Sequence, residues 1–377
     1  MAPAPFRQLS ADEARLLRAR AQRLGVPPPP ADGVASVVGR VCGVQAQDRR
    51  AAALAVRARS SGLTTGDVEQ AQLVERSVVR TWAMRGTFHL VPAGDVGWTL
   101  SLLGPIFVAA GRRRLAELGL DESQCSHGVG TIRRALERHG SRTRAQLADD
   151  LRADGLPVER GGRAVVHLVR RAALEGVLCV GPDHDGDEAY VALDDWLGMD
   201  VTGTAVGGDT ALAELGRRYL TAYGPADPED LAAWSGIPVG RARRAWDLLA
   251  DEVTEVSVDG SPSWLLAREG LDVGPGRRPS ARLLPAFDTY LLGYRSRALQ
   301  VDDRYARRVW PGGGWIHPTL SVDGRLVATW RLVSDQVVVA PFEPVPPAVL
   351  RSLEDEAADV GRFLGESTSL TVERADR

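Results

Sequence analysis

The chain has 377 residues, of which 44% are hydrophobic and 25% are charged, and its formal net charge is −3. This is typical of a soluble globular protein of two or three domains, or of several small modules packed as one body, and the net charge does not by itself indicate nucleic-acid binding. The chain contains no lysine, so all 46 basic residues are arginines. This excludes a lysine Schiff base, including one with pyridoxal phosphate, and the lysine of a P-loop.

Other classes of protein are also disfavoured. No apolar run approaches the roughly 20 residues that span a bilayer, and the first residues lack the apolar core of a secretory signal. We therefore expect a cytoplasmic protein with no membrane partner. The three cysteines form no CxxC pair and the histidines show no metal spacing, so we expect no disulfide framework, no metal and no cofactor.

The N-terminal region is predicted to be mainly helical. A helix begins after Ser10, and Glu13 three residues later completes the pattern of a capping box. Residues 80–92, RTWAMRGTFHLVP, have strand-forming residues on both sides of Arg85-Gly86. This arrangement predicts a short β-hairpin, after which residues 92–118 return to helix.

The middle of the chain contains an internal repeat. Residues 133–151 align without gaps with residues 217–235, and Thr143 and Asp227 occupy equivalent helix N-cap positions. Each copy predicts a helix, a glycine-containing turn and a second helix, followed by a third helix and two strands. This is the order of a winged-helix module, which usually binds DNA through its third helix but also serves in protein interactions.

Arginines gather on the predicted third helices and near the C-terminal region. The third helix of the first copy carries Arg163, His167 and Arg170 at helical spacing, and GRARRAW at 240–246 and RYARRVW at 304–310 are further clusters. Arginine makes forked contacts that suit phosphates and guanine edges. Any one cluster is equally compatible with a solvated helix face.

The last hundred residues turn to β-structure. Residues 281–294 predict a strand with a turn, and residues 317–342 alternate well enough to predict three strands in a meander around Asp323-Gly324. We expect this meander to close a small barrel, covered by a helix over residues 346–365.

Two glutamines, Gln45 and Gln47, stand in the stretch VCGVQAQD. Gly43 can end one helix and Asp48 can cap the next, so the pair is predicted to lie in an irregular junction. In an extended segment residues two apart share a face, whereas in a helix they diverge. Two amides facing one point can hold and aim a water molecule, but they cannot act as a strong base. From the residues alone, a Gln-x-Gln pair is more commonly explained as two surface residues without a function.

Four separated segments resemble signature segments of the YcaQ/AlkZ winged-helix DNA glycosylase family. They keep their order between about residues 10 and 370 and read VCGVQAQD, RTWAMRGTFHLVP, LLPAFDTYLLGYRSR and GGWIHPTLSVDGRLVATWR. The resemblance implies an α+β fold of three tandem winged-helix units and a small C-terminal β-barrel that form a concave DNA-binding body. The expected division is 1–125 with the QAQ motif, winged helices at 126–200 and 205–270, and the barrel with its helix at 275–377.

The catalytic element of this family is a Gln, an aliphatic residue and then Gln or Asp, so the resemblance implies that Gln45 and Gln47 are catalytic. The Gln form is similar to the AlkZ branch, which is associated with self-resistance to DNA-alkylating natural products, and the Asp form belongs to the YcaQ branch. Ala46 is smaller than the middle residue of some members, which leaves the subgroup open.

The implied activity is hydrolysis of the N-glycosidic bond of N7-alkylguanine, including bulky adducts and interstrand crosslinks, by a monofunctional glycosylase that leaves an abasic site. N7 alkylation makes the base cationic, so no acid is needed to protonate the leaving group, and the absence of lysine fits an enzyme that does not cleave the strand. The expected partner is double-stranded DNA with alkylated guanine, bound by a monomer in the nucleoid.

Further residues are expected to contact substrate or DNA. We select them because they belong to the arginine clusters, are polar residues within apolar segments, or lie in the segments that resemble the family. They are Arg85, His89, Asp288, His317, Trp315, Arg163, Arg170, Arg241, Arg244, Arg307 and Arg308. Asp288 could equally cap a turn. Two other functions stay open: a non-catalytic winged-helix DNA-binding regulator, which would not depend on the two glutamines, and a winged-helix protein-interaction scaffold.

Overall fold

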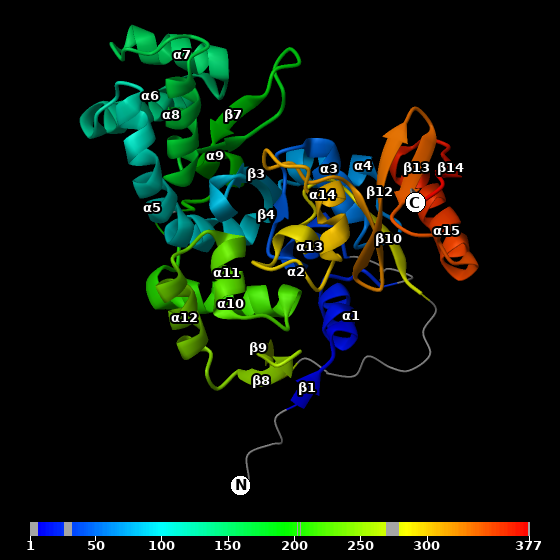
Figure 1. Ribbon diagram of the computed structural model, residues 1–377. Helices are drawn as coiled ribbons and strands as arrows, with labels where there is room; N and C mark the ends of the chain where they lie inside the picture. The colour runs from blue at the N-terminus through cyan, green and yellow to red at the C-terminus, as the bar shows by residue number, and fades with distance from the viewer. Residues whose placement is uncertain (1–6, 26–31, 202, 204, 269–278, 376–377) are drawn as a thin grey trace. The chain divides into compact units, whose positions relative to one another are not determined.

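The computed structural model describes residues 7–25, 32–201, 203, 205–268 and 279–375 (Figure 1). The chain divides into two compact units, one formed by residues 1–69 with 213–377 and the other by residues 70–212. The division into four predicted segments stays a prediction, and its limits at residues 1, 270, 275 and 377 lie outside the described residues.

The N-terminal part of the first unit is helical, as predicted. Its elements are β1 (Arg7–Leu9), α1 (Ala11–Ala21), α2 (Val34–Arg40), β2 (Val44–Gln45), α3 (Arg49–Arg57) and α4 (Thr65–Glu69). The capping box is confirmed, because the Ser10 side chain accepts from the backbone N–H of Glu13 and the Glu13 carboxylate accepts from that of Ser10. Strand β1 was not predicted; it has three residues and pairs in parallel with a strand far along the chain.

The second unit holds the predicted hairpin and the first copy of the repeat. It begins with a π-helical turn (Gln70–Val74), followed by β3 (Val78–Trp82), a 3-10 turn (Met84–Gly86) and β4 (Phe88–Pro92). The later elements are α5 (Ala93–Glu117), α6 (Glu122–His139), β5 (Ser141–Thr143), α7 (Arg144–Ala153), α8 (Arg163–Leu174), β6 (Leu178–Val180), β7 (Ala189–Ala192) and α9 (Leu193–Leu197). Its strands pair in the order β4-β3-β6-β7-β5. The hairpin is confirmed, with Trp82 opposite Phe88.

The second copy of the repeat has the same order of elements. They are α10 (Gly208–Tyr223), which contains the boundary between the two units, then α11 (Pro228–Ser235), α12 (Val239–Leu248), β8 (Val253–Val258) and β9 (Ser261–Leu266). Thr143 and Asp227 both cap their helices, as predicted. Residues 142 and 226 are equivalent in the repeat, and each pairs with the second strand of its own copy, Arg142 with Tyr190 and Ala226 with Trp264. The two copies therefore share a topology as well as a sequence pattern.

Helix α5 forms where the sequence predicted a helix. By length and apolar composition it would suit a membrane span, although no uninterrupted apolar run of that length is visible in the sequence. In the structure α5 packs against α8, so closely that a Cβ at Gly104 would collide with the carbonyl oxygen of Leu174. Packing inside the second unit therefore accounts for many of its apolar residues.

The C-terminal region forms a five-stranded sheet. Its elements are β10 (Ala281–Leu284), α13 (Thr289–Leu292), a 3-10 turn (Asp303–Tyr305), α14 (Ala306–Val309), β11 (Thr319–Val322), β12 (Arg325–Val333), β13 (Gln336–Pro341), α15 (Pro347–Leu364) and β14 (Ser369–Val372). The predicted three-strand meander is confirmed as β11-β12-β13. The predicted closed barrel is instead a curled half-barrel, because β10 and β14 are its two edges. Strand β14, which was not predicted, adds in parallel to β13.

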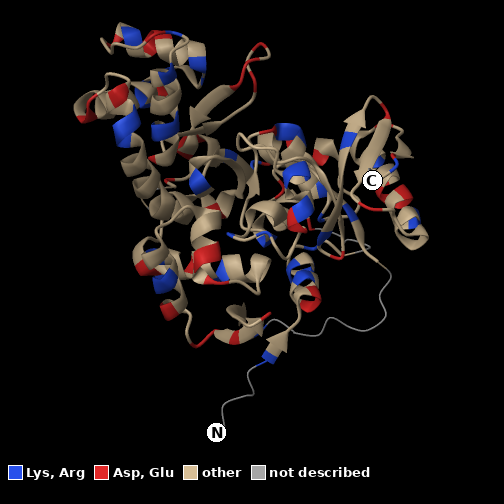
Figure 2. Cartoon of the chain, viewed as in Figure 1, with Lys and Arg blue, Asp and Glu red and all other residues tan. Residues whose placement is uncertain are grey.

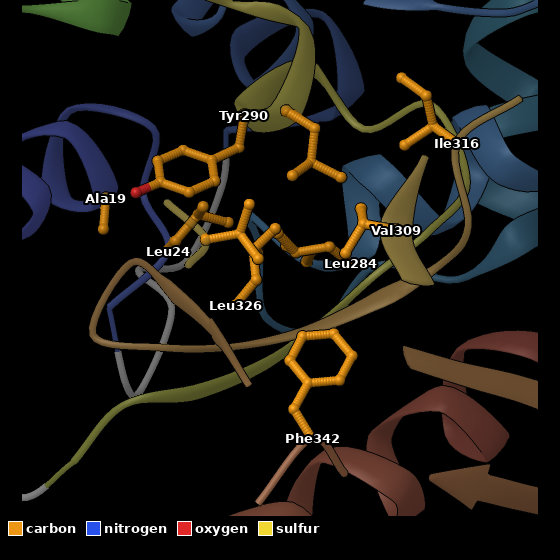
Figure 3. Close-up of a cluster of buried hydrophobic side chains, with 11 residues drawn as sticks. Ala19, Leu24, Leu284, Tyr290, Val309, Ile316, Leu326 and Phe342 are labelled. Carbon is orange, nitrogen blue, oxygen red and sulfur yellow. The ribbon is translucent and has the colours of Figure 1, made fainter. Parts of the chain in front are cut away.

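A buried apolar cluster joins the N-terminal helices to this sheet. Figure 3 shows Ala19 and Leu24 near Tyr290, with Leu284, Val309 and Ile316 on the other side of the cluster. Ala58, which directly follows α3, belongs to the same cluster. Parts of the chain more than 200 residues apart in sequence therefore share one core.

Candidate active site

Gln45 and Gln47 lie in a short irregular junction between α2 and α3, as the sequence predicts. Gln45 ends β2, Ala46 is 0% exposed and Gln47 is exposed. Strand β2 ends at Gln45, and the chain bends at Gln47 and Asp48 before α3 begins. Ala46 is thus buried between two glutamines that are more exposed. That both amides approach one water molecule stays a prediction.

The chain reaches this junction through two residues in the left-handed region. Cys42 has φ 55° and Gly43 has φ 101°, and the Gly43 N–H donates to the carbonyl of Val38 at 2.9 Å. Gly43 adopts this conformation without a steric penalty, whereas Cys42 is strained by about 1 kcal/mol or more. The hydroxyl of Tyr223 donates to the Val41 carbonyl at 3.0 Å and so fixes the turn from the second repeat.

The same tripeptide occurs a second time, which the sequence reasoning overlooked. Gln70-Ala71-Gln72 lies in the π-helical turn of the second unit, where residues two apart do not share a face. The two copies differ in their neighbours, since Gly43 and Asp48 flank the first and a helix runs into the second. The first copy begins with a strand residue, Gln45, whereas the second copy is helical throughout.

Helix α3 starts directly after the motif, and both of its ends are fixed. At its start the Asp48 carboxylate accepts from the N–H of Ala51 at 2.9 Å. At its end the buried Arg57 donates to Glu356 at 3.0 Å and to the Leu283 carbonyl at 2.8 Å. Burial raises the pKa of Glu356, but the charges of Arg57 and Arg282 outweigh it and hold this pKa below its ordinary value. Helix α3 is thereby tied to α15 and β10.

A second buried pair lies just beyond α3 and contains Asp288, one of the predicted substrate contacts. Its carboxylate accepts from Arg59 at 2.7 and 2.8 Å and from the N–H of Tyr290 at 2.9 Å. Arg59 also donates to Gln22 at 2.7 Å. Asp288 therefore caps α13 and anchors Arg59, and a contact with substrate stays a prediction. Sequence reasoning missed Arg57 and Arg59, whose only signal was an arginine pair at the end of an alanine-rich apolar segment.

The other predicted contacts in the first unit lie on its surface or near it. Trp315 is half exposed and its ring contacts Phe287, whereas the backbone N–H of His317 donates to the Val309 carbonyl. Arg308 stacks over the ring of Phe342 at 4.9 Å. Three arginines are exposed: Arg307 on α14, and Arg241 and Arg244 on α12.

The predicted contacts in the second unit gather around the hairpin and α8. Arg85 sits at the hairpin turn with φ 54°. Next to it, Gly86 allows Arg170 to approach, because a Cβ at Gly86 would collide with that guanidinium. Arg163 is exposed at the start of α8. The structure therefore brings Arg170 to the hairpin turn, which sequence spacing did not predict.

His89 is buried on β4, where its Nδ1 contacts the carbonyl oxygen of Thr87 at 3.0 Å. Burial, reinforced by the charge of Arg85, lowers the pKa of His89 to about 3. The imidazole is therefore neutral near pH 7 and is poorly suited to act as a general acid there.

This pKa predicts a pH dependence of stability. Because the folded-state pKa lies below the unfolded value of about 6.5, the unfolded chain binds more protons between the two values. The free energy of unfolding should then decrease as pH falls below 6.5, by up to about 1.4 kcal/mol per pH unit. Urea unfolding at pH 7, 6 and 5 measures this slope. A His89→Asn variant should lose that part of the slope, whereas replacement of the exposed His139 should keep it. Equal slopes for wild type and His89→Asn would contradict the assignment.

Charge is distributed in both signs over the surface. Figure 2 shows arginine and acidic residues interspersed along the helices of both units. Several arginines are paired locally, for example Arg217 with Glu252 and Arg243 with Glu229. Within the described parts of the chain, no group of three or more His, Cys, Asp or Glu side chains is placed to hold a metal ion.

Comparison with known proteins identifies relatives over almost the whole chain. The family model for AlkZ-like DNA glycosylases matches residues 38–363. An interstrand DNA cross-link repair glycosylase from Streptomyces sahachiroi is 30% identical over 366 residues, which cover 92% of this chain and 95% of the relative. The solved structure of the S. sahachiroi DNA glycosylase AlkZ superposes with a TM-score of 0.86 at 28% identity, covering 97% of this chain and 100% of that one.

Proposed function

The chain belongs to the AlkZ-like DNA glycosylase family, and from that premise we propose that it hydrolyses the N-glycosidic bond of N7-alkylated guanine in double-stranded DNA. Gln45 and Gln47 are the proposed catalytic residues. The observation that carries this proposal is the short junction between α2 and α3, in which Ala46 is buried in the core and the two flanking glutamines are more exposed.

The chemistry of the substrate matches what two amides can do. Alkylation at N7 gives the purine a positive charge, so the bond between C1′ and N9 breaks with its electron pair moving onto a base that leaves as a neutral molecule. The sugar passes through an oxocarbenium-like state, as in other glycoside hydrolyses. Water then adds at C1′ and loses a proton to solvent. An amide can position that water through its acceptor and donors, and no protonated side chain is needed to assist departure.

The rest of the chain supplies surfaces for DNA. We assign both repeat copies, and by resemblance the region of residues 1–125, as winged-helix units. Arginines are exposed on their third helices, Arg163 in α8 and Arg241 and Arg244 in α12, and we propose that they contact phosphates. Such contacts would keep a monomeric enzyme on chromosomal DNA. The absence of lysine supports a monofunctional enzyme that releases the base and leaves an abasic site.

The proposed range of lesions is based on the named relative. The S. sahachiroi protein is an interstrand DNA cross-link repair glycosylase, and we extend that substrate class to this chain, together with bulky monoadducts. We also propose a function in self-resistance to a DNA-alkylating natural product, because the Gln-x-Gln motif resembles that of the AlkZ branch. Family membership favours this catalytic function over a regulator that only binds DNA.

The test is release of free base from a duplex that carries one N7-methylguanine. Purified protein should release N7-methylguanine, detected by mass spectrometry, and leave an alkali-labile abasic site without cutting the strand. The reaction should proceed in EDTA, which tests metal independence, and the same duplex with unmodified guanine is the control. No release above the spontaneous rate at excess enzyme would sink the proposal and leave the DNA-binding regulator as the better account.

A further inference from the structure

The loop at residues 311–315, PGGGW, presents an aromatic side chain on the surface of the first unit. Gly312, Gly313 and Gly314 have φ values of 115°, 62° and 77°, and the N–H of Trp315 donates to the Gly312 carbonyl at 3.1 Å. A Cβ on any of the three glycines would meet nothing within 4 Å. The glycines are therefore required by the backbone conformation and not by crowding. Their conformation sets the direction in which the chain reaches Trp315.

The loop is attached to the core immediately after Trp315. Ile316 is 4% exposed and packs in the apolar cluster with Leu284 and Val309 (Figure 3). The N–H of His317 donates to the Val309 carbonyl at 3.0 Å. Trp315, one residue earlier, is 50% exposed. A large indole is thus held in solvent on a firmly attached backbone, although burial of an aromatic ring is normally favourable.

Phe287 supplies a second and independent observation. Its ring contacts that of Trp315 edge-on, with centroids 5.1 Å apart and planes at 83°. Its φ of 56° is sterically unfavourable for a bulky side chain. The next residue, Asp288, holds this backbone through its buried pair with Arg59. Backbone strain that is held in place by surrounding structure is characteristic of functional sites.

The neighbouring charges indicate the chemistry of the occupant. Helix α14, whose last residue bonds to His317, carries Arg307, which is exposed, and Arg308. An exposed aromatic surface combined with arginines is how proteins bind nucleobases that have left the duplex stack, since every base has a planar face and an adjacent phosphate. An uncharged apolar partner would not need the arginines.

We propose that Trp315, supported by Phe287, stacks on a nucleobase that is displaced from the duplex while DNA is bound. The proposal rests on the proposed function for the identity of DNA as the ligand. It adds a positioning residue for that substrate. The stacking surface belongs entirely to the first unit, which also contains Gln45 and Gln47.

The test compares two DNA duplexes that differ by a single base. One has one extrahelical adenine, and the other has a tetrahydrofuran abasic residue at the same position, so phosphate contacts are equal. Wild-type protein should bind the adenine duplex about 10-fold more tightly, as expected for one stacked base. Trp315→Ala should abolish this preference and Trp315→Phe should retain part of it. Val333→Ala, which removes an apolar side chain of similar exposure (48%) elsewhere in the unit, should keep it fully.

Two results would overturn the inference: no preference in wild-type protein, or an undiminished preference in Trp315→Ala. Thermal unfolding of each variant checks that it is folded. This test measures DNA binding and not base release, so it can succeed even if the proposed function is wrong. If the proposed function alone fails, wild-type protein releases no N7-methylguanine but still prefers the adenine duplex through Trp315.

Discussion

Replacing Gln45 and Gln47 together with alanine is expected to reduce the rate of base release from N7-methylguanine DNA by about 100-fold or more. The reason is geometric: the amides aim the attacking water, and misplacement of a reacting group by about 1 Å already costs about 100-fold. DNA affinity should change by no more than about twofold, because neither side chain is charged. Single-turnover base release, with anisotropy for binding, measures the two effects separately.

The second Gln-Ala-Gln tripeptide provides a matched control. Gln70→Ala with Gln72→Ala removes the same two side chains from the same tripeptide, but in the π-helical turn. This variant should keep the wild-type rate. Loss of activity in the Gln70/Gln72 variant with full activity in the Gln45/Gln47 variant would show that the wrong pair was assigned. The single variants Gln45→Ala and Gln47→Ala should each lose most of the rate, because the effects of two residues that position the same water molecule do not add.

The Asp288→Ala substitution is expected to lower the free energy of unfolding by about 3–5 kcal/mol. The carboxylate and Arg59 are both fully buried, so removal of one partner leaves an uncompensated buried charge. Removing the carboxylate also removes the cap of α13. Urea unfolding at neutral pH measures the change through the transition midpoint at constant slope.

Two variants make this measurement decisive. Glu373→Ala breaks the exposed pair with Arg331 and should cost no more than about 1 kcal/mol. Arg59→Met combined with Asp288→Leu replaces the buried pair by apolar groups and should recover part of the loss, because no charge remains buried. An Asp288→Ala protein as stable as Glu373→Ala would mean that the buried pair does not anchor this region.

Local features of the fold could be predicted because their causes are local. The capping box at Ser10, the caps at Thr143 and Asp227 and the hairpin at residues 78–92 depend on residues a few positions apart. The repeat was visible for the same reason, since its two copies carry the same local signals. The irregular junction at Gln45 also follows from its neighbours, because Gly43 takes a positive φ and Asp48 caps the next helix.

Long-range pairing could not be predicted. Strand β1 has three residues and β14 has four, so neither carries enough alternation to be recognised, and each pairs in parallel with a strand that is distant in sequence or separated by a helix. The lack of information on long-range pairing also explains why a closed barrel was predicted. Whether a meander closes or stays a half-barrel depends on which strands lie at its edges, and this is decided by tertiary contacts.

By itself, the sequence determined the family, the α+β elements and the junction that contains the two glutamines. Only the tertiary structure decided which buried charges anchor the end of α3 and the residues that follow it. Arg57 ends α3 and Arg59 follows two residues later, yet their partners Glu356 and Asp288 lie more than 200 residues away. A buried charge needs a partner in space, and spacing along the chain carries no information about a partner at that distance. The contact of Trp315 with Phe287 was also not visible in the sequence, because a contact between two rings depends on how the loops that carry them fold.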